Sequence, residues 1–128
     1  MTDFFDALET RDPQQREADL MAALPQMVAH AQARSAAFAE ILRGVDAASV
    51  TSRAALARLP VTRKHELFER QKAQRASDVF GGFATTVRGP QMRRIYASPG
   101  PIYEPEGPRA DYWRAARAMF AAGFRAGD

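Results

Sequence analysis

The residues best suited to chemistry lie in one stretch that contains Ser, Gly and Pro, residues 96–107. The stretch follows a short β-prone run and precedes a typical helix start at Pro108, an order of strand, loop and helix that many phosphate-binding sites share. Yet only two of its twelve residues are Gly, whereas three are Pro and two are Glu. Each Pro removes a backbone N–H that could bind phosphate, and Glu104 and Glu106 would repel an anion. The framework suits a nucleotide loop, but the residues that fill it do not.

Other groups that could carry chemistry are few. The chain has no Cys, which excludes disulfides, thiolate metal sites and a Cys nucleophile. Its only two histidines, His30 and His65, do not predict a metal site, and we interpret both as surface or core-edge side chains rather than catalytic bases. We therefore expect no catalytic residue and no metal ligand in this chain.

Composition is ordinary for a soluble globular protein. The 128 residues fit one domain, with 46% apolar and 26% charged residues. The net charge of +3 comes largely from arginine and is weak evidence for an anionic partner. No apolar run is long enough to span a membrane, and the first residues lack the basic start of a signal peptide, so we expect a cytoplasmic protein without membrane contact. Nucleic-acid binding is not favoured, because neither stacking aromatics nor a known module is recognisable.

Capping residues and apolar periodicity predict a helical first half. Pro25 interrupts the first apolar pattern and should kink that helix or split it in two. Helix starts are expected at the capping residues Asp12, Ser35, Thr51 or Ser52, and Thr62.

The second half predicts a turn, a hairpin and a last helix. The turn lies at residues 80–83, and strands over 83–87 and 93–97 are expected to pair through a Gly89-Pro90 turn. The last helix is expected from Pro108 to about Gly123, with Trp113 and Phe120 packed in a core.

Two of these segments carry a family resemblance. Residues 59–67, Leu-Pro-Val-Thr-Arg-Lys-His-Glu-Leu, resemble the segment Leu-Pro-(Phe/Val)-Thr-x-Lys-x-x-Leu near the start of phenylacetate–CoA ligases. Residues 94–98, followed by Gly100 and Pro105, stand where those enzymes carry Arg-(Val/Ile)-x-Ala-Ser-Ser-Gly-Thr-Thr-Gly-Lys-Pro. The turn at 80–83 and the ending at 121–128 also match in order, so the resemblance covers about residues 12–128.

The resemblance implies an adenylate-forming enzyme that joins an aromatic carboxylate to coenzyme A with ATP and Mg²⁺. By position, Ser98 matches a loop serine, Gly100 a loop glycine and Pro105 the closing proline, and these three residues are the cofactor-binding candidates. Glu104 replaces the family's loop lysine, which removes a cation facing phosphate. The family's acyl pocket, adenine-binding region, magnesium-binding segment and C-terminal lysine domain would all follow Asp128. The chain alone is therefore expected to bind no cofactor and to be inactive.

The sequence thus predicts an α+β fold, predominantly helical with a small β-hairpin, as the N-terminal fragment of a larger α/β adenylate-forming enzyme. Residues 1–78 would form a helical region, 79–107 the hairpin and divergent loop, and 108–128 the C-terminal helix. The alternative is a non-catalytic helical interaction module derived from that fold. The stretch from Ser98 to Gly107 would then be a structural or partner-contacting loop. Self-association, or contact with the remainder of the enzyme, through helix faces at 13–45 or 109–124 is the expected partnership.

Overall fold

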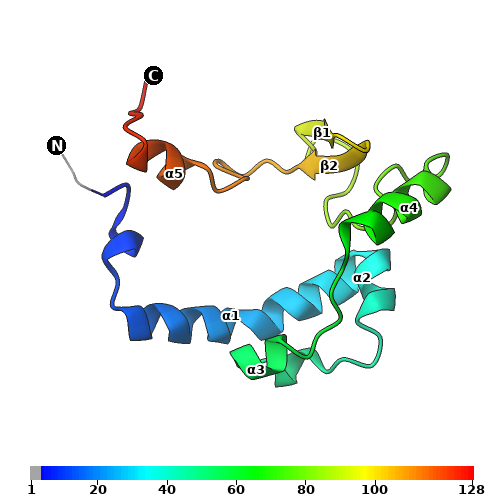
Figure 1. Ribbon diagram of the computed structural model, residues 1–128, viewed down its shortest axis with the longest axis horizontal. Coiled ribbons are helices and arrows are strands. Elements are labelled where there is room, and N and C mark those ends of the chain that lie inside the picture. The colour runs from blue at the N-terminus through cyan, green and yellow to red at the C-terminus, as the bar shows by residue number, and fades with distance from the viewer. Residues whose placement is uncertain (1–3) are drawn as a thin grey trace.

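The structure is a computed structural model that describes residues 4–128, and its fold is α+β. Its helices and strands in chain order are η1 (Ala7–Thr10), α1 (Pro13–Arg34), α2 (Ala36–Ile41), η2 (Ala47–Ser49), α3 (Arg53–Leu56), α4 (Lys64–Gln74), β1 (Arg94–Ser98), β2 (Ile102–Glu106) and α5 (Ala116–Ala121), where η marks a 3-10 helix. Figure 1 shows α1 along the lower edge, α4 and the hairpin at the right, and α5 returning above α1. The described residues thus confirm a helical chain with one small hairpin. The sequence also predicts that an acidic lead-in, residues 1–11, docks on the rest of the chain through Phe4 and Phe5. Residues 1–3 of it lie outside the described part.

Three of the predicted helix caps are confirmed. The Asp12 carboxylate accepts hydrogen bonds from the Gln14 and Gln15 N–H groups, each at 2.9 Å. Ser35 caps α2 and Ser52 caps α3 through their hydroxyl oxygens. Short polar side chains at these positions satisfy N–H groups that have no partner inside the helix. Local sequence therefore determines where the first three α-helices begin.

Two details of the helical half are corrected. Of the two outcomes predicted for Pro25, the split is wrong, because α1 continues through Pro25 and residues on both sides of it pack against one core. Helix α4 is capped one residue later than expected, at Arg63 rather than Thr62. The Glu66 carboxylate accepts a hydrogen bond from the Arg63 N–H at 3.1 Å, which closes the first turn from inside the helix.

The main hydrophobic core is small and lies where α1 meets α2, η2 and α3. Its buried members are Val28, Leu42, Val50 and Ala55, with Leu24, Ala31, Phe38, Ile41, Val45, Ala47 and Leu59 packed around them. Since every member lies in residues 24–59, this core holds the helical half together but does not reach the hairpin. The hairpin must be attached by other contacts.

The turn at residues 80–83 provides the first of these contacts. The Gly82 carbonyl accepts hydrogen bonds from the Ser35 hydroxyl at 2.7 Å and from the Ala37 N–H at 3.1 Å, so the turn is joined to α2. The Gly81 carbonyl accepts from the Arg70 side chain on α4 at 2.8 Å. A Cβ on Gly81 would lie 3.0 Å from the Gln71 nitrogen, and its φ of +61° also favours glycine. Gly81 and Gly82 therefore allow this turn to pack between α2 and α4.

Gln71 joins the hairpin to the helical half. Its side chain is buried in α4, and its amide pairs with the backbone of Tyr103 in both directions. The Gln71 Nε2 donates to the Tyr103 carbonyl at 2.9 Å, and its Oε1 accepts from the Tyr103 N–H at 2.8 Å. These two bonds take the place of a neighbouring strand along one edge of β2. The hairpin thereby acquires a fixed position on α4.

The hairpin is correct in kind but formed by different strands than expected. Residues 83–87 are not a strand; β1 pairs antiparallel with β2, in a register that sets Ser98 opposite Ile102 and Arg94 opposite Glu106. Most of the expected loop from Ser98 to Gly107 is therefore strand. Pro105 is tolerated inside β2 because an outer strand has one edge where no ladder bond is required.

The C-terminal helix is also shorter than expected. Asp111 and Arg114 adopt positive φ angles of 48° and 57°, which keeps the residues after Pro108 out of a helix. The Asp111 carboxylate accepts from the Ala115 and Ala116 N–H groups at 2.8 and 3.0 Å, so α5 begins there. Trp113 precedes the helix and remains 47% exposed, so its expected core position is wrong.

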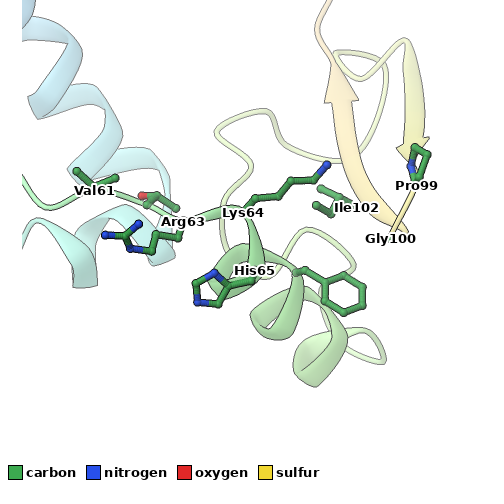
Figure 2. Close-up of a pocket in the computed structure, with 9 residues that line it drawn as sticks. Val61, Arg63, Lys64, His65, Pro99, Gly100 and Ile102 are labelled. Atoms are coloured by element: carbon green, nitrogen blue, oxygen red, sulfur yellow. The ribbon is translucent and has the colours of Figure 1, made fainter.

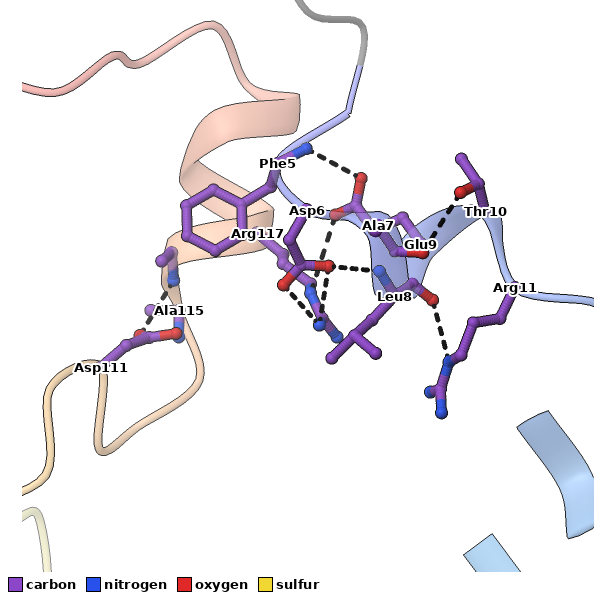
Figure 3. A network of polar contacts seen from close by, with 11 residues as sticks. Phe5, Asp6, Ala7, Leu8, Glu9, Thr10, Arg11, Asp111, Ala115 and Arg117 are labelled. Carbon is purple, nitrogen blue, oxygen red and sulfur yellow. Dashed lines mark hydrogen bonds and ion pairs between the residues drawn. The ribbon is translucent and has the colours of Figure 1, made fainter. Parts of the chain in front are cut away.

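Residues near the two ends of the described chain meet at a clasp, in which Phe5, Asp6 and Glu9 contact Arg117 and Phe120. Figure 3 shows the polar contacts of this clasp. Arg117 Nη2 donates to both oxygens of the Asp6 carboxylate, at 3.0 and 2.8 Å, and its Nε lies 3.8 Å from Glu9. The Phe5 and Phe120 rings pack edge to face with centroids 5.9 Å apart. The acidic lead-in thus docks on α5 through both kinds of contact. Phe5 packs on an aromatic ring of α5, and the neighbouring Asp6 pairs with an arginine of the same helix.

Replacing Gln71 with Met tests whether the side-chain amide holds the hairpin on α4. Met fills a similar volume but leaves the Tyr103 N–H and C=O without their partners, so we expect the free energy of unfolding to fall by about 1–3 kcal/mol. Gln74→Met is the matched control. No hydrogen bond of the Gln74 side chain is present among the described residues, and its loss should change stability by about 0.5 kcal/mol or less. Urea unfolding measures both, and equal effects would contradict the assigned role.

Candidate functional site

The tip of the hairpin faces the start of α4 across a cavity of about 680 Å³, here called the tip cavity (Figure 2). Its lining residues are Val61, Thr62, Arg63, Lys64, His65, Phe68, Pro99, Gly100 and Ile102. All of them except Phe68 come from the two segments that carry the family resemblance, residues 59–67 and the stretch after residue 94. The fold therefore brings together two motifs that lie more than twenty-five residues apart in the sequence.

The tip cavity is lined by basic side chains and by no acidic one. Figure 2 shows the Lys64 side chain extending toward the hairpin, whereas the Arg63 guanidinium and the His65 ring point away from it. All three residues stand in the first turn of α4, where the helix dipole also favours negative charge. The cavity is thus suited to an anionic group held mainly by the Lys64 ammonium.

Gly100 lies at the hairpin tip, beside the start of α4. Its φ is +153°, which favours glycine, and a larger residue would be strained there. A Cβ at this position would lie 3.4 Å from the Ile102 side chain and 3.6 Å from the Phe68 ring, both ordinary contact distances. Of the three cofactor-binding candidates, Gly100 is the one that lines the tip cavity.

The other two candidates lie elsewhere. Ser98 is the last residue of β1, opposite Ile102, and Pro105 lies in β2 opposite Ile95. Pro105 lines a second cavity of about 250 Å³, here called the aromatic cavity, which shares only Ile102 with the first. The structure therefore separates the family-matched positions instead of gathering them around one ligand.

The two glutamates of this stretch do not face the tip cavity. Glu104 is exposed and lines the aromatic cavity, whereas Glu106 is buried at the end of β2. The expectation that both would repel an anion at the tip is therefore wrong. They are carried away from the tip because the stretch forms a strand and not a curled loop.

Glu106 joins β1, β2 and Trp113. Its carboxylate accepts from the Trp113 indole N–H at 3.1 Å and from the Arg94 guanidinium at 2.9 Å. The hydrogen bond from Trp113, then one from Tyr96 and then the nearby Arg94 charge outweigh the effect of burial and hold the pKa of Glu106 below its ordinary value. The Trp113 ring also packs edge to face on Tyr96, with centroids 5.7 Å apart. One carboxylate thereby positions the indole that closes one wall of the aromatic cavity.

This arrangement predicts an acid-sensitive tryptophan. A lowered pKa means that Glu106 stabilises the fold above the ordinary glutamate pKa of about 4.3 and loses that contribution as pH falls through its folded-state value. We expect the fluorescence of Trp113, the only Trp in the chain, to change on acidification below pH ~4 while far-UV circular dichroism still shows folded helices. Glu106→Gln should abolish that step. A step of the same size in the variant would assign the transition to other carboxylates.

Sequence reasoning missed the aromatic cavity entirely. Its aromatic rings come from α2, α4's neighbouring turn, β2 and the segment before α5, none of which are adjacent in the sequence. The one signal of this cavity in the sequence is the density of Phe and Tyr in residues 80–113, which by itself equally fits strand and core positions.

The described residues contain neither a group that could hold a metal ion nor a helix that could cross a membrane. Between residues 4 and 128, no group of three or more His, Asp or Glu side chains is placed to hold a metal ion. Among the helices of the same range, none has the length and apolar character needed to cross a membrane.

The chain matches no protein-family model, and neither a curated protein nor a solved structure shows significant similarity to it. Function has to be inferred from the geometry of the two cavities and from the sequence resemblance.

Proposed function

We propose that this chain is the N-terminal part of a phenylacetate–CoA ligase-like, AMP-forming acyl- or aryl-CoA ligase. In this proposal the chain scaffolds the nucleotide-binding domain and contributes the tip cavity to it. The parts that select the acid, hold adenine and complete catalysis lie outside these residues, so the 128-residue chain by itself does not form a thioester.

The single observation that carries the proposal is the meeting of two family-like segments at one cationic cavity. Lys64 occupies the lysine position of the first segment, and Gly100 occupies a loop glycine position of the second. Both line the tip cavity, where the Lys64 ammonium extends toward the hairpin. The cation lost from the loop at Glu104 is thus replaced by one from the start of α4, which supports phosphate binding despite the divergent loop.

The residues present fit a nucleotide phosphate better than they fit a magnesium ion. Lys64 would hold a phosphate oxygen, with the charge of Arg63 nearby. Bound ATP would supply the phosphoanhydride that activates the acid. No carboxylate lines the tip cavity, so Mg²⁺ would need ligands from outside it.

Titration with ATP in the absence of Mg²⁺ tests the proposal. The sequence alone predicts no cofactor binding by the 128-residue chain, but the basic tip cavity leads us to expect weak, saturable binding of ATP. Lys64→Ala should weaken it at least about tenfold, since a charged hydrogen bond contributes roughly 1.5–3 kcal/mol. Lys72→Ala is the matched control. It removes the same charge from the exposed face of α4, where Lys72 does not line the cavity; there Lys72 makes a 3.8 Å surface pair with Glu69 and lies 6.0 Å from the centroid of the Phe68 ring.

Two results would count against this function. Equal weakening by Lys64→Ala and Lys72→Ala would show that ATP responds only to net charge. No binding by the folded wild-type chain would remove the phosphate role and leave the hairpin as a structural connector.

A second candidate, a non-catalytic interaction module, is favoured by one specific observation. Helix α1 keeps Leu20 50% exposed and Met27 63% exposed, outside the small core that buries its other face. The far end of the chain adds Met119 and Phe124, which are 45% and 49% exposed. Apolar surface of this kind is commonly covered by a partner.

Self-association is the prediction of this second candidate. We expect sedimentation at tens-of-micromolar concentration to reveal a dimer or larger assembly, and Met27→Lys to shift it toward monomer without loss of helix content. Ala29→Lys places the same charge at another exposed position of α1 and serves as the control. A monomeric wild type would exclude self-association through these surfaces.

A further inference from the structure

We propose that the aromatic cavity binds a small organic cation, such as an arylalkyl ammonium ion. The cavity is about 250 Å³ in volume, and its aromatic lining residues are Phe38, Phe80, Phe83, Tyr103, Tyr112 and Trp113. Glu104 is the one charged residue that lines it. This inference does not rest on the proposed nucleotide function, since the two cavities share only Ile102.

The rings provide walls that attract positive charge. Phe38 and Phe83 pack edge to face at 5.5 Å, and Tyr112 and Trp113 do so at 5.1 Å, so the walls contain rings in perpendicular orientations. An aromatic face carries negative electrostatic potential and attracts a cation within about 6 Å of its centroid. The chain already uses two of these rings in this way: the Arg70 and Arg75 guanidinium carbons lie 5.9 and 5.8 Å from the centroids of Phe83 and Tyr103.

Glu104 determines the sign of the charge that the ligand must carry. Its carboxylate makes no ion pair with any residue between positions 4 and 128, whereas Arg70 is paired with Glu40 at 2.8 Å. Arg75 lies against the Tyr103 ring but does not line the cavity, so the one charge among the lining residues is negative. A cation gains attraction from it, and an aromatic carboxylate is repelled.

The size and origin of the cavity limit the ligand further. At about 250 Å³ it is smaller than a pocket for a drug-sized molecule, so one ring or one methylated ammonium group suits it. Its walls come from α2, α4, the turn at 80–83, β2 and the segment before α5. A ligand that contacts all of them binds only the folded arrangement and should raise thermal stability.

Benzyltrimethylammonium is the probe, with phenylacetate as its anionic counterpart. We expect calorimetric titration to show saturable binding of the cation by the wild-type chain, with a shift of the Trp113 indole proton resonance. Glu104→Gln should weaken this binding roughly tenfold, because it removes the charge and keeps the shape. Glu69→Gln makes the same change at an exposed position of α4 that does not line the cavity, and it should bind as the wild type does.

Three outcomes would overturn the inference. They are no saturable binding by the folded wild type, equal weakening by Glu104→Gln and Glu69→Gln, and phenylacetate binding as tightly as the ammonium. Phe83→Leu provides a second measurement, since it preserves an apolar wall but removes a ring, and unchanged affinity there would exclude the aromatic contribution. Circular dichroism on each variant establishes that it is folded. ATP binding that depends on Lys64 can succeed or fail independently of all these results.

Discussion

The position of the hairpin depends on one buried amide. Gln71 satisfies both backbone groups of Tyr103, at 2.8 and 2.9 Å, and no part of the main hydrophobic core reaches β2. Hydrogen bonding is directional in a way that apolar contact is not, so this pair fixes which edge of β2 meets α4 and at which residue. The shape of both cavities follows from this placement of β2 on α4. The tip cavity forms because the hairpin tip is carried toward the start of α4, and the aromatic cavity forms beside Gln71 itself.

Strand geometry then separates the charges. Had residues 98–107 curled as a loop, Glu104 and Glu106 would lie near any bound phosphate. As strand β2, the same residues place Glu106 under Trp113 and Arg94, and Glu104 beside the aromatic rings. The basic residues at the start of α4 are left to line the tip cavity, and no acidic residue lines it with them. One hairpin therefore separates a cationic cavity from an anionic one, and this separation supports two different ligand classes.

Local signals in the sequence predicted local structure well. The caps at Asp12, Ser35 and Ser52 need only a short polar side chain and the next three N–H groups, so they could be identified without tertiary contacts. The strand pairing could not be identified in this way. Residues 83–87 have β propensity, but propensity does not specify a partner, and Tyr103 lies on the paired strand partly because Gln71, thirty-two residues away, bonds to it. The aromatic cavity could not be predicted for the same reason, since its walls come from segments that meet only in the folded chain.

The same dependence explains why the family-matched positions do not gather at one site. A loop that grips phosphate must present several N–H groups from consecutive residues, and Pro99 and Pro101 on either side of Gly100 remove two of them. A hairpin tip with few donors can still contribute to an anion site if another element brings the charge. Lys64 meets that requirement because α4 begins beside the tip, and α4 is held there by Gln71 and the Gly81–Gly82 turn. Phosphate recognition in this chain would therefore depend on tertiary packing, whereas in a glycine-rich loop it depends on local backbone conformation.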